Sequence, residues 1–285
     1  MITVQAALQR GQSTLFYAEV ETPLLDATVL LGEALGLSKE QLLARPETPV
    51  QEEGWRRFQE FLDRRCRGIP VSYIRRKKEF FSLEFYVDER VLVPRPDTEA
   101  LVEEALRLLD QRLGDSRREA LLVHDACTGS GCVAIALQHS RPGLLVSASD
   151  ISPGAEEVFR LNCRRLLDRE LPFHRSNLLE QVAGPYDLIT ANPPYLRDVE
   201  VEGMRKVGWP EPREALAGGS DGTSLLAALI RQAPARLAPR GFLLLEADPP
   251  QALFVRQRLL AAGFQEVEVV PDLAGRPRVI RGRRP

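Results

Sequence analysis

The chain has 285 residues, a length that suits one catalytic domain together with a small additional domain. Hydrophobic residues make up 44% and charged residues 27%, which is typical of a globular protein. The formal net charge of −2 excludes a global basic field that would attract nucleic acid. No apolar stretch approaches the roughly 20 residues of a transmembrane helix, and we expect no signal peptide.

The cysteines and histidines indicate neither a metal site nor a redox motif. No two cysteines form a Cys-x-x-Cys pair, and the histidines lack the spacing of metal ligands. We therefore expect a reduced cytoplasmic protein without a bound metal. The residues concerned are Cys66, Cys127, Cys132, Cys163, His124, His139 and His174.

Residues 1–76 are predicted to form an N-terminal helical domain. Apolar residues recur at three- and four-residue spacing from Thr3 to Tyr17 and from Pro23 to Leu35, the period of an amphipathic helix. Ser38 and Gln41 form the pattern of a capping box that opens a short helix. Packing in a small bundle explains these patterns, and the region shows no residues with evident chemistry.

Residues 77–96 are predicted to form a β-hairpin linker. Apolar residues alternate over residues 81–87, polar residues occupy 88–90, and the alternation resumes over 91–93. This pattern is typical of two paired strands joined by a turn, so we expect the turn at 88–90.

Residues 97–285 are predicted to form an α/β domain with a mostly parallel sheet, because strand and helix patterns alternate there. Pro96 and Asp97 are expected to open its first helix. The predicted strands are 121–123, 144–149, 187–191, 241–247, 266–270 and a last one near 278–280.

A turn with two glycines joins the first of these strands to the following helix. Its sequence is Asp125-Ala126-Cys127-Thr128-Gly129-Ser130-Gly131. Glycines at this place let the backbone approach a ligand closely. The second strand ends in Asp150, 19 residues after Gly131, and an acid at that spacing suits the ribose hydroxyls of a nucleotide. Together these features indicate a site for a nucleotide-like cofactor.

Asn192-Pro193-Pro194-Tyr195 is the most informative stretch of the chain. It follows the apolar run 187–191, so it lies at the carboxyl end of a strand, where open α/β sheets place their active sites. The two prolines remove N–H donors and favour extended backbone, which leaves the carbonyls of Asn192 and Pro193 as acceptors. A planar NH2 group would suit these acceptors, with the tyrosine ring beside it. A proline-rich turn without function is the alternative.

These motifs together resemble the class I methyltransferases that use S-adenosylmethionine, and the Asn-Pro-Pro-Tyr motif resembles that of enzymes methylating planar nitrogens. More narrowly, the chain resembles the release factor glutamine methyltransferases, the HemK/PrmC-like family. Three further segments carry this likeness: Gly68–Ile74, Val93–Glu99 and Glu211–Gly222. The string Pro-Arg-Pro-Asp-Thr-Glu within the second segment is the most family-specific of them.

The resemblance implies a Rossmann-like methyltransferase sheet and methyl transfer from S-adenosylmethionine, with S-adenosylhomocysteine as product. The acceptor would be the side-chain N5 of the glutamine in the Gly-Gly-Gln motif of class 1 peptide chain release factors. The helical domain would help to recognise that protein. We expect a cytoplasmic monomer that binds no nucleic acid directly and no membrane.

The family's motifs also assign roles to single residues. Cofactor contacts would come from Asp125, Thr128, Gly129, Gly131, Asp150, Ile151, Asn177 and Asn192. Catalysis would depend on Asn192, Pro193 and Tyr195, and substrate contacts would come from these three together with Pro194 and Leu92. The Asn192 side-chain oxygen and the Pro193 carbonyl would each accept one substrate N–H, so catalysis would rest on positioning rather than on a nucleophile or metal.

Three departures from the family pattern stand near this site. Ala126-Cys127 replaces the usual Leu-Gly, Asn177 replaces an aspartate that contacts adenine, and Leu92 replaces an aromatic residue found in some relatives. For Asn177 a loop cap is the alternative role. Arg95 and Glu99 resemble family positions at the domain junction, for which a structural ion pair is the alternative.

Three other functions remain open at this point. They are adenine-N6 methylation of DNA or RNA, glutamine methylation of a ribosomal protein, and cofactor binding without catalysis. The lack of a basic recognition domain and the signature at 94–99 argue against the first. The altered turn at Ala126-Cys127 suggests the third.

Overall fold

The computed structural model describes residues 2–115 and 120–285. The chain divides into two compact units. The first comprises Met1–Lys77 with Met204–Pro210, and the second comprises Lys78–Gly203 with Glu211–Pro285.

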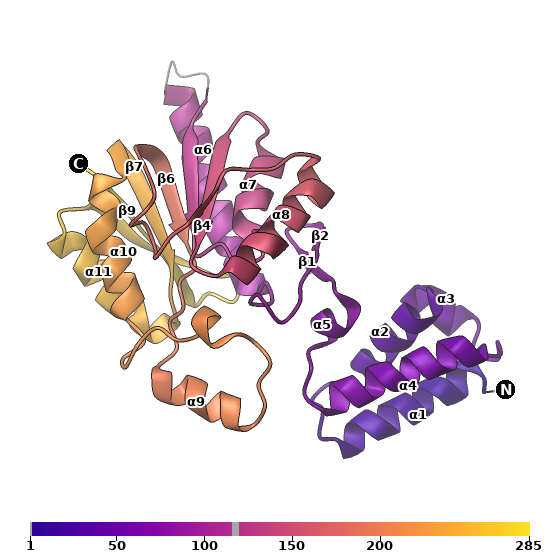
Figure 1. Ribbon diagram of the computed structural model, residues 1–285. Helices are drawn as coiled ribbons and strands as arrows, with labels where there is room; N and C mark the ends of the chain where they lie inside the picture. The colour runs from indigo at the N-terminus through magenta and orange to yellow at the C-terminus, as the bar shows by residue number, and fades with distance from the viewer. Residues whose placement is uncertain (1, 116–119) are drawn as a thin grey trace. The chain divides into compact units, whose positions relative to one another are not determined.

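The first unit is built mainly from helices (Figure 1). They are α1 (Val4–Tyr17), α2 (Pro23–Leu35), α3 (Lys39–Ala44), α4 (Glu52–Cys66) and α5 (Val71–Arg75). The helices predicted for Thr3–Tyr17 and Pro23–Leu35 are confirmed, and Ser38 with Gln41 forms the predicted capping box. Leu15, Leu31 and Phe58 are fully buried where α1, α2 and α4 meet, as the apolar spacing requires.

A short hairpin begins the second unit. Strand β1 (Lys78–Phe80) pairs antiparallel with β2 (Leu83–Phe85), so Phe81 and Ser82 form a two-residue turn. Both turn residues have positive φ, 49° and 60°. This is the backbone of a tight hairpin turn, for which Asn-Gly would be the usual sequence.

The predicted position of the hairpin turn was therefore wrong. Residues 88–90 do turn, but they do not join paired strands. The Asp88 carboxylate accepts hydrogen bonds from the backbone N–H of Arg90 at 3.1 Å and from its guanidinium Nε at 2.9 Å. This local carboxylate–guanidinium contact stabilises the bend without a strand ladder, and the apolar alternation concealed the true turn.

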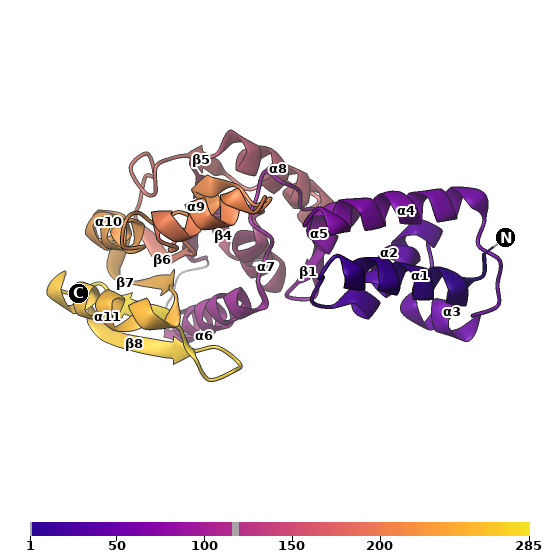
Figure 2. The same cartoon turned by 90° about the horizontal axis from the view of Figure 1, so that it is seen from below.

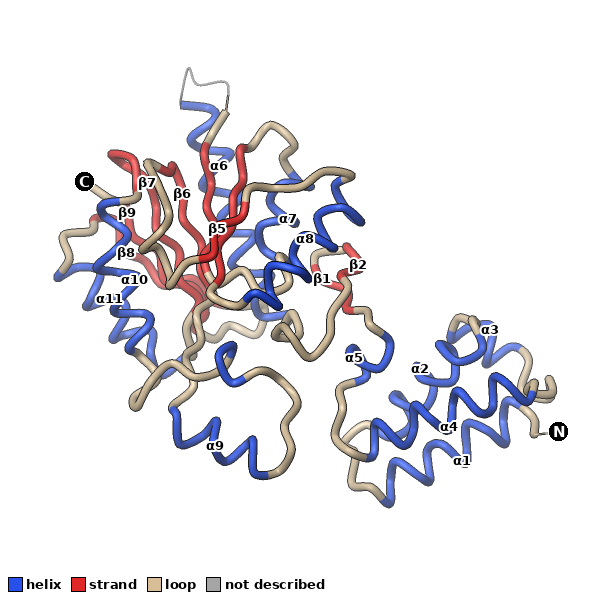
Figure 3. Tube along the Cα trace, viewed as in Figure 1, coloured by secondary structure: helices blue, strands red, loops and turns tan. Residues whose placement is uncertain are grey.

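A seven-stranded sheet forms the centre of the second unit, with strand order β5-β4-β3-β6-β7-β9-β8 (Figure 3). The neighbouring strands from β5 to β7 are parallel, whereas β9 is antiparallel to both β7 and β8. The strands are β3 (Leu122–Ala126), β4 (Leu145–Asp150), β5 (Phe173–Arg175), β6 (Tyr186–Ala191), β7 (Leu237–Glu246), β8 (Gln265–Pro271) and β9 (Pro277–Arg283). The six strands predicted for residues 97–285 are present, and the three-residue β5 had not been predicted.

Helices cover both faces of this sheet (Figures 1 and 2). Helices α6, α7 and α8 pack in sequence on one face, and α10 and α11 pack together on the other. The helices of this part are η1 (Pro96–Thr98), α6 (Glu99–Asp115), α7 (Cys132–Ser140), α8 (Pro153–Leu167), α9 (Asp198–Lys206), η2 (Arg213–Ala215), α10 (Ser224–Gln232), η3 (Ala233–Ala235), η4 (Pro249–Gln251) and α11 (Ala252–Ala261). With both faces covered, all six residues of β6 are buried, which explains its continuous apolar sequence.

The strand order reverses between β3 and β6. The chain runs outward from β3 through β4 to β5 and then returns to place β6 on the other side of β3. The helices before and after this reversal lie on opposite faces, so a crevice opens beyond the carboxyl ends of β3 and β6. The glycine turn follows β3 and Asn192 follows β6, so the fold brings the two main sequence motifs to the same place.

The buried side chain of Asn162 connects α8 to two loops near this crevice. Its Oδ1 accepts the backbone N–H of Tyr86 at 2.8 Å, while its Nδ2 donates to the carbonyls of Tyr86 at 3.0 Å and Ser130 at 2.9 Å. One amide thus satisfies three backbone groups and joins the segment after β2 to the glycine turn.

We predict that Asn162→Ala lowers the free energy of unfolding by about 2 to 4 kcal/mol, because it leaves buried backbone groups without partners. Urea denaturation measures this loss. Arg164→Ala, on the same helix, is the control: its ion pair with Glu170 is half exposed, and we expect a change of about 0.5 kcal/mol or less. Equal effects of the two variants would contradict the role given to Asn162.

Candidate active site

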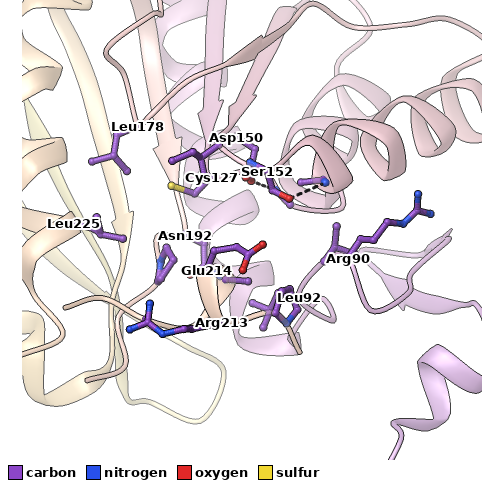
Figure 4. Close-up of a pocket in the computed structure, with 18 of the residues that line it drawn as sticks. Arg90, Leu92, Cys127, Asp150, Ser152, Leu178, Asn192, Arg213, Glu214 and Leu225 are labelled. Atoms are coloured by element: carbon purple, nitrogen blue, oxygen red, sulfur yellow. Dashed lines mark hydrogen bonds between the residues drawn. The ribbon is translucent and has the colours of Figure 1, made fainter. Parts of the chain in front are cut away.

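A cavity of about 270 Å³ lies at this crevice within the second unit (Figure 4). Cys127 and Asp150 lie along one side of it, and Asn192, Glu214 and Leu92 lie along the other. Of the predicted site residues, those lining the cavity are Leu92, Gly129, Asp150, Ile151, Asn177, Asn192 and Pro194. The other predicted residues, Asp125, Thr128, Gly131, Pro193 and Tyr195, are outside this lining.

The turn requires glycine at positions 129 and 131 for two different physical reasons. Gly129 lines the cavity with φ of 53°, and a Cβ there would meet nothing within 4 Å. Its bare backbone is therefore open to a ligand. Gly131 has φ of 84°, and a Cβ there would lie 2.6 Å from Cδ2 of Phe159. The second glycine thus allows α8 to pack closely against the turn.

The buried carboxylate of Asp125 holds the glycine turn in place through hydrogen bonds. One carboxylate oxygen accepts the Thr128 hydroxyl at 2.6 Å and the other accepts the Thr190 hydroxyl at 2.8 Å. Burial raises the pKa of Asp125 to about 6, although these two hydroxyl donors offset part of the rise. The carboxylate is 2% exposed and satisfied by protein groups, so its role is to hold the turn against β6.

Asp150 presents a carboxylate that is already held in place. Its Oδ2 accepts the backbone N–H of Gly129 at 2.9 Å, and its Oδ1 accepts that of Ser152 at 3.0 Å (Figure 4). Burial raises the pKa of Asp150, and these backbone donors counteract that rise. Because a carboxylate has about four acceptor positions, each oxygen keeps one for a ligand hydroxyl.

Cys127 occupies a backbone conformation that favours glycine. Its φ is 56°, in the left-handed region, so this position carries about 1 to 2 kcal/mol of strain with a side chain present. The cysteine thus stands, in place of the family's usual glycine, at a sterically restricted position. Burial, together with the nearby Asp150 and Asp125, raises the pKa of the Cys127 thiol well above its usual value. A raised pKa keeps the thiol neutral and therefore poorly reactive, so we interpret Cys127 as a small residue that the turn tolerates.

Asn192 uses one end of its amide for the protein. Its Nδ2 donates to the Thr98 hydroxyl oxygen at 3.2 Å. Within residues 2–115 and 120–285, Oδ1 has no hydrogen-bond partner, and the side chain lines the cavity. The oxygen is thus the part of the amide left for a ligand.

The Asn192–Tyr195 segment packs against Gly218, Gly222 and Gln251, for which the sequence had suggested no role. A Cβ at Gly218 would lie 2.6 Å from the Pro194 carbonyl oxygen, and one at Gly222 would lie 2.4 Å from the Tyr195 carbonyl oxygen. The Gln251 Nε2 donates to the carbonyls of Tyr195 at 2.9 Å and Gly222 at 3.1 Å. The glycines at 218–222 therefore permit the close approach that fixes this segment.

Glu246 is a second residue that had not been predicted. It ends β7, is 1% exposed, and its Oε2 has no hydrogen-bond partner among the described residues. Burial raises the pKa of Glu246 to about 7, and the nearby Thr98, Arg278 and Tyr195 side chains offset part of that rise. A single acid within the apolar run 241–247 was the available sequence signal.

The remaining expected residues have structural contacts. Arg95 pairs with the buried Glu211 at 2.6 Å, while the Glu99 carboxylate accepts the backbone N–H of Phe81 at 2.9 Å. The two expected partners, Arg95 and Glu99, thus bind other groups. Asn177 lines the cavity, and its Nδ2 donates a hydrogen bond to Glu180 at 3.0 Å. The side chain thus makes the local contact expected of a loop cap, while its Oδ1 remains available to a ligand.

Residues 2–115 and 120–285 hold no group of three or more His, Cys, Asp or Glu side chains that could bind a metal ion. In the same ranges, no helix combines the length and apolar character needed to cross a bilayer. Cys66, Cys127, Cys132 and Cys163 are free thiols.

We predict that Glu246→Gln stabilises the protein at neutral and basic pH. Since the folded-state pKa of Glu246 is raised from 4.5 to about 7, the ionised group opposes folding increasingly as pH rises through that window. The variant should gain about 1 to 3 kcal/mol over the wild type at pH 8 and little at pH 4.5. Urea denaturation at both pH values tests this, and an equal gain at both would argue against a buried ionisable group.

Two family models match the chain. The PrmC N-terminal domain matches residues 6–75, and the Methyltransferase small domain matches residues 99–206. A release factor glutamine methyltransferase of Moorella thermoacetica is 38% identical over 280 residues, which is 97% of each chain. Another, of Bradyrhizobium diazoefficiens, is 37% identical and covers 99% of this chain and 95% of its own.

A solved structure supports the fold independently. A methyltransferase from Pyrococcus furiosus is similar with a TM-score of 0.53 at 17% identity, covering 78% of this chain and 98% of its own. The predicted Rossmann-like methyltransferase sheet and the predicted helical N-terminal domain are therefore both confirmed. With 37% to 38% identity to curated members over nearly its whole length, the chain belongs to the release factor glutamine methyltransferase family.

Proposed function

We propose that this protein transfers a methyl group from S-adenosylmethionine to the side-chain N5 of the glutamine in the Gly-Gly-Gln motif of class 1 peptide chain release factors. One observation carries the proposal. The free Oδ1 of Asn192 lies in the same cavity as the Asp150 carboxylate, beside two prolines that supply no competing N–H donor. An acceptor for an amide therefore adjoins an acceptor for ribose hydroxyls.

The residues present suit S-adenosylmethionine. Gly129 leaves backbone open to the cavity, Asp150 keeps acceptor capacity for ribose hydroxyls, and Ile151 and Leu178 offer apolar surface for a base. Asn177 would accept the adenine amino group through Oδ1, since its Nδ2 is held by Glu180. Asp125, Thr128 and Gly131 would act indirectly, by fixing the shape of the turn.

Bound S-adenosylmethionine supplies a methyl group activated by a sulfonium sulfur, and its product is S-adenosylhomocysteine. The Asn192 Oδ1 and the Pro193 carbonyl each accept one N–H of the substrate amide. These contacts orient the amide nitrogen and stabilise the positive charge that develops on it, after which the nitrogen releases a proton. Positioning and electrostatics therefore replace a nucleophile, because a carboxamide nitrogen is a poor nucleophile whose geometry must be fixed.

Tyr195 and Leu92 complete the proposed substrate site. Burial raises the pKa of the Tyr195 phenol, with Glu246 adding to the rise, so the ring stays neutral. A neutral ring packs beside the reacting group and presents its negative face to a cation. Leu92 and Pro194 line the cavity and exclude water from the amide.

The proposed setting follows from the same family relationship. The protein would act in the cytoplasm as a monomer on a release factor, without binding nucleic acid directly. The helical first unit, which contains the PrmC N-terminal match, would contribute to recognising that protein.

The enzymatic test is mass spectrometry of a purified class 1 release factor after incubation with this protein and S-adenosylmethionine. We expect one added methyl group on the Gly-Gly-Gln glutamine, and a loss of rate of about 100-fold or more in Asn192→Ala, since one preorganised contact is removed. Arg197→Ala is the matched control, because this exposed residue lies close in sequence but outside the cavity lining.

The alternatives would give different results. Methylation of oligonucleotides with none on a release factor would contradict the proposal in favour of adenine-N6 methylation. Methylation confined to a ribosomal protein would favour that substrate. Cofactor binding with no methylation of any of them would indicate a non-catalytic protein.

Cofactor contacts are tested by isothermal titration calorimetry with S-adenosylmethionine. We predict that Asp150→Asn weakens binding about 10- to 100-fold, because a charged acceptor is lost. Asn177→Ala should weaken it by a smaller factor, since one neutral hydrogen bond is lost. Cys127→Gly should leave the affinity within about threefold, since a neutral thiol makes no specific contact. A large change in Cys127→Gly with none in Asp150→Asn would reverse these assignments.

A further inference from the structure

A buried histidine lies in the central sheet, outside the cavity lining. His124 on β3 is fully enclosed, and its register partner on β4 is Ser147. Ser149 lies two residues further along β4, so both serines are on the face of the sheet that carries the imidazole. Nδ1 of the ring lies 2.9 Å from the Ser147 hydroxyl, and Nε2 lies 2.9 Å from the Ser149 hydroxyl. The imidazole therefore joins two hydroxyls on the neighbouring strand.

The Ser149 hydroxyl connects this group to the cavity. It donates to the backbone carbonyl of Leu178 at 3.3 Å. Leu178 lines the cavity (Figure 4), and its φ of 55° lies in the left-handed region, which is uncommon for a leucine. Within residues 2–115 and 120–285, this carbonyl has no other hydrogen-bond partner. The Ser149 hydroxyl therefore holds a backbone conformation that the leucine alone would disfavour.

The direction of these hydrogen bonds fixes the tautomer of His124. Burial, with His174 nearby, lowers the pKa of His124 to about 3, so the ring is neutral and has one donor and one acceptor nitrogen. Because the Ser149 proton is given to the Leu178 carbonyl, the Ser149 oxygen accepts from the ring. The ring proton therefore lies on Nε2, and Nδ1 accepts the hydroxyl proton of Ser147.

The opposite tautomer would break the contact with the cavity wall. With its proton on Nδ1, the ring would accept the Ser149 hydroxyl at Nε2, and the Leu178 carbonyl would lose its donor. Ser147 opposes this change, because Nδ1 is the nearest acceptor of its proton. The Val123 carbonyl and the Tyr186 hydroxyl lie farther from the Ser147 hydroxyl, at 3.4 Å and 3.3 Å.

We propose that His124 and Ser149 are positioning residues: the imidazole directs the Ser149 hydroxyl onto the Leu178 carbonyl and thereby fixes the cavity wall for the cofactor base. This inference rests on the proposed function, because it takes S-adenosylmethionine as the occupant of the cavity. Ser149 immediately precedes Asp150, so adjacent residues of β4 hold the base wall and the ribose acceptor. Asn177 precedes Leu178 in the same segment, so its place is fixed as well.

The tautomer is tested by NMR of the free protein containing isotope-labelled histidine. The chain has 3 histidines, so substitution of each in turn assigns the imidazole signals. We expect the His124 proton on Nε2 in the wild type. A proton on Nδ1 would overturn the proposal, because Ser149 would then donate to the ring instead of to Leu178.

The contact with Leu178 is tested by isothermal titration calorimetry with S-adenosylmethionine. We expect Ser149→Ala to weaken binding about 3- to 10-fold, because one hydrogen bond that holds the cavity wall is lost. His124→Leu should weaken it about 2- to 5-fold. His124→Gln should recover most of that loss, because its amide can place an N–H near the Nε2 position. Gln138→Ala is the matched control: Gln138 is buried and donates to the Pro142 carbonyl at 3.0 Å, but it lies outside the cavity lining.

Steady-state kinetics separates positioning from general damage to the fold. In Ser149→Ala the KM for S-adenosylmethionine should rise about 3- to 10-fold, while kcat and the KM for the release factor stay within about twofold. The reason is that the substrate contacts at Asn192 are untouched. Gln138→Ala should change none of these constants by more than about twofold. A fall in kcat with an unchanged KM for S-adenosylmethionine in Ser149→Ala would overturn the proposal.

Failure of this proposal is distinguishable from failure of the proposed function. Wild-type affinity in Ser149→Ala, in a protein that binds S-adenosylmethionine and methylates a release factor, would refute the positioning role and leave the function standing. If the wild type does not bind S-adenosylmethionine, the proposed function fails and amide hydrogen exchange decides the role. The amides of residues 177 and 179, which donate to side chains in the wild type, should exchange faster in Ser149→Ala but not in Gln138→Ala. Unchanged exchange in Ser149→Ala would refute the role.

Discussion

The buried carboxylate of Asp125 is the interaction on which the site depends. Its two oxygens bind hydroxyls on different elements, Thr128 in the glycine turn and Thr190 on β6. Thr190 lies two residues before Asn192, so a single side chain fixes the glycine turn, where we propose that the cofactor binds, relative to the segment proposed to bind the substrate. A methyl transfer that relies on orientation needs such a fixed relation, because misplacement of about 1 Å is already costly.

Three buried carboxyl groups lie near the carboxyl ends of the parallel strands, and the burial of each ionised group lowers the free energy of unfolding. Burial raises the pKa values of Asp125, Asp150 and Glu246, so each favours its neutral form more than it would in water. Proteins retain such groups mainly where function requires them. Here they create negative potential around the site proposed for a cationic cofactor, and the backbone and hydroxyl donors keep that charge tolerable.

The sequence predicted the architecture because its strong signals are local. Strands such as β6 are buried on both faces and appear as apolar runs, and the glycine turn and the Asn192–Tyr195 segment each follow one of them. The hairpin was misplaced because Phe81 and Ser82 adopt positive φ without a turn-forming sequence. The contacts of Asn162 could not be predicted either, because they join residues far apart in the chain and depend on the packed structure.

The register of the sheet explains why the proposed cofactor-binding and methyl-transfer residues lie at the same edge. Ala126 lies opposite Ser149 on β4 and Ala191 on β6, and Ala191 lies opposite Leu245 on β7. The next residue on each strand therefore falls in one transverse row, which consists of Cys127, Asp150, Asn192 and Glu246. Asp150 and Asn192 in this row carry the oxygens proposed to accept ribose hydroxyls and the substrate amide, and Glu246 adds a buried carboxyl group beside them. Because the hydrogen-bonded strands set this row, they also set the distance between the glycine turn at Cys127 and the segment that begins at Asn192.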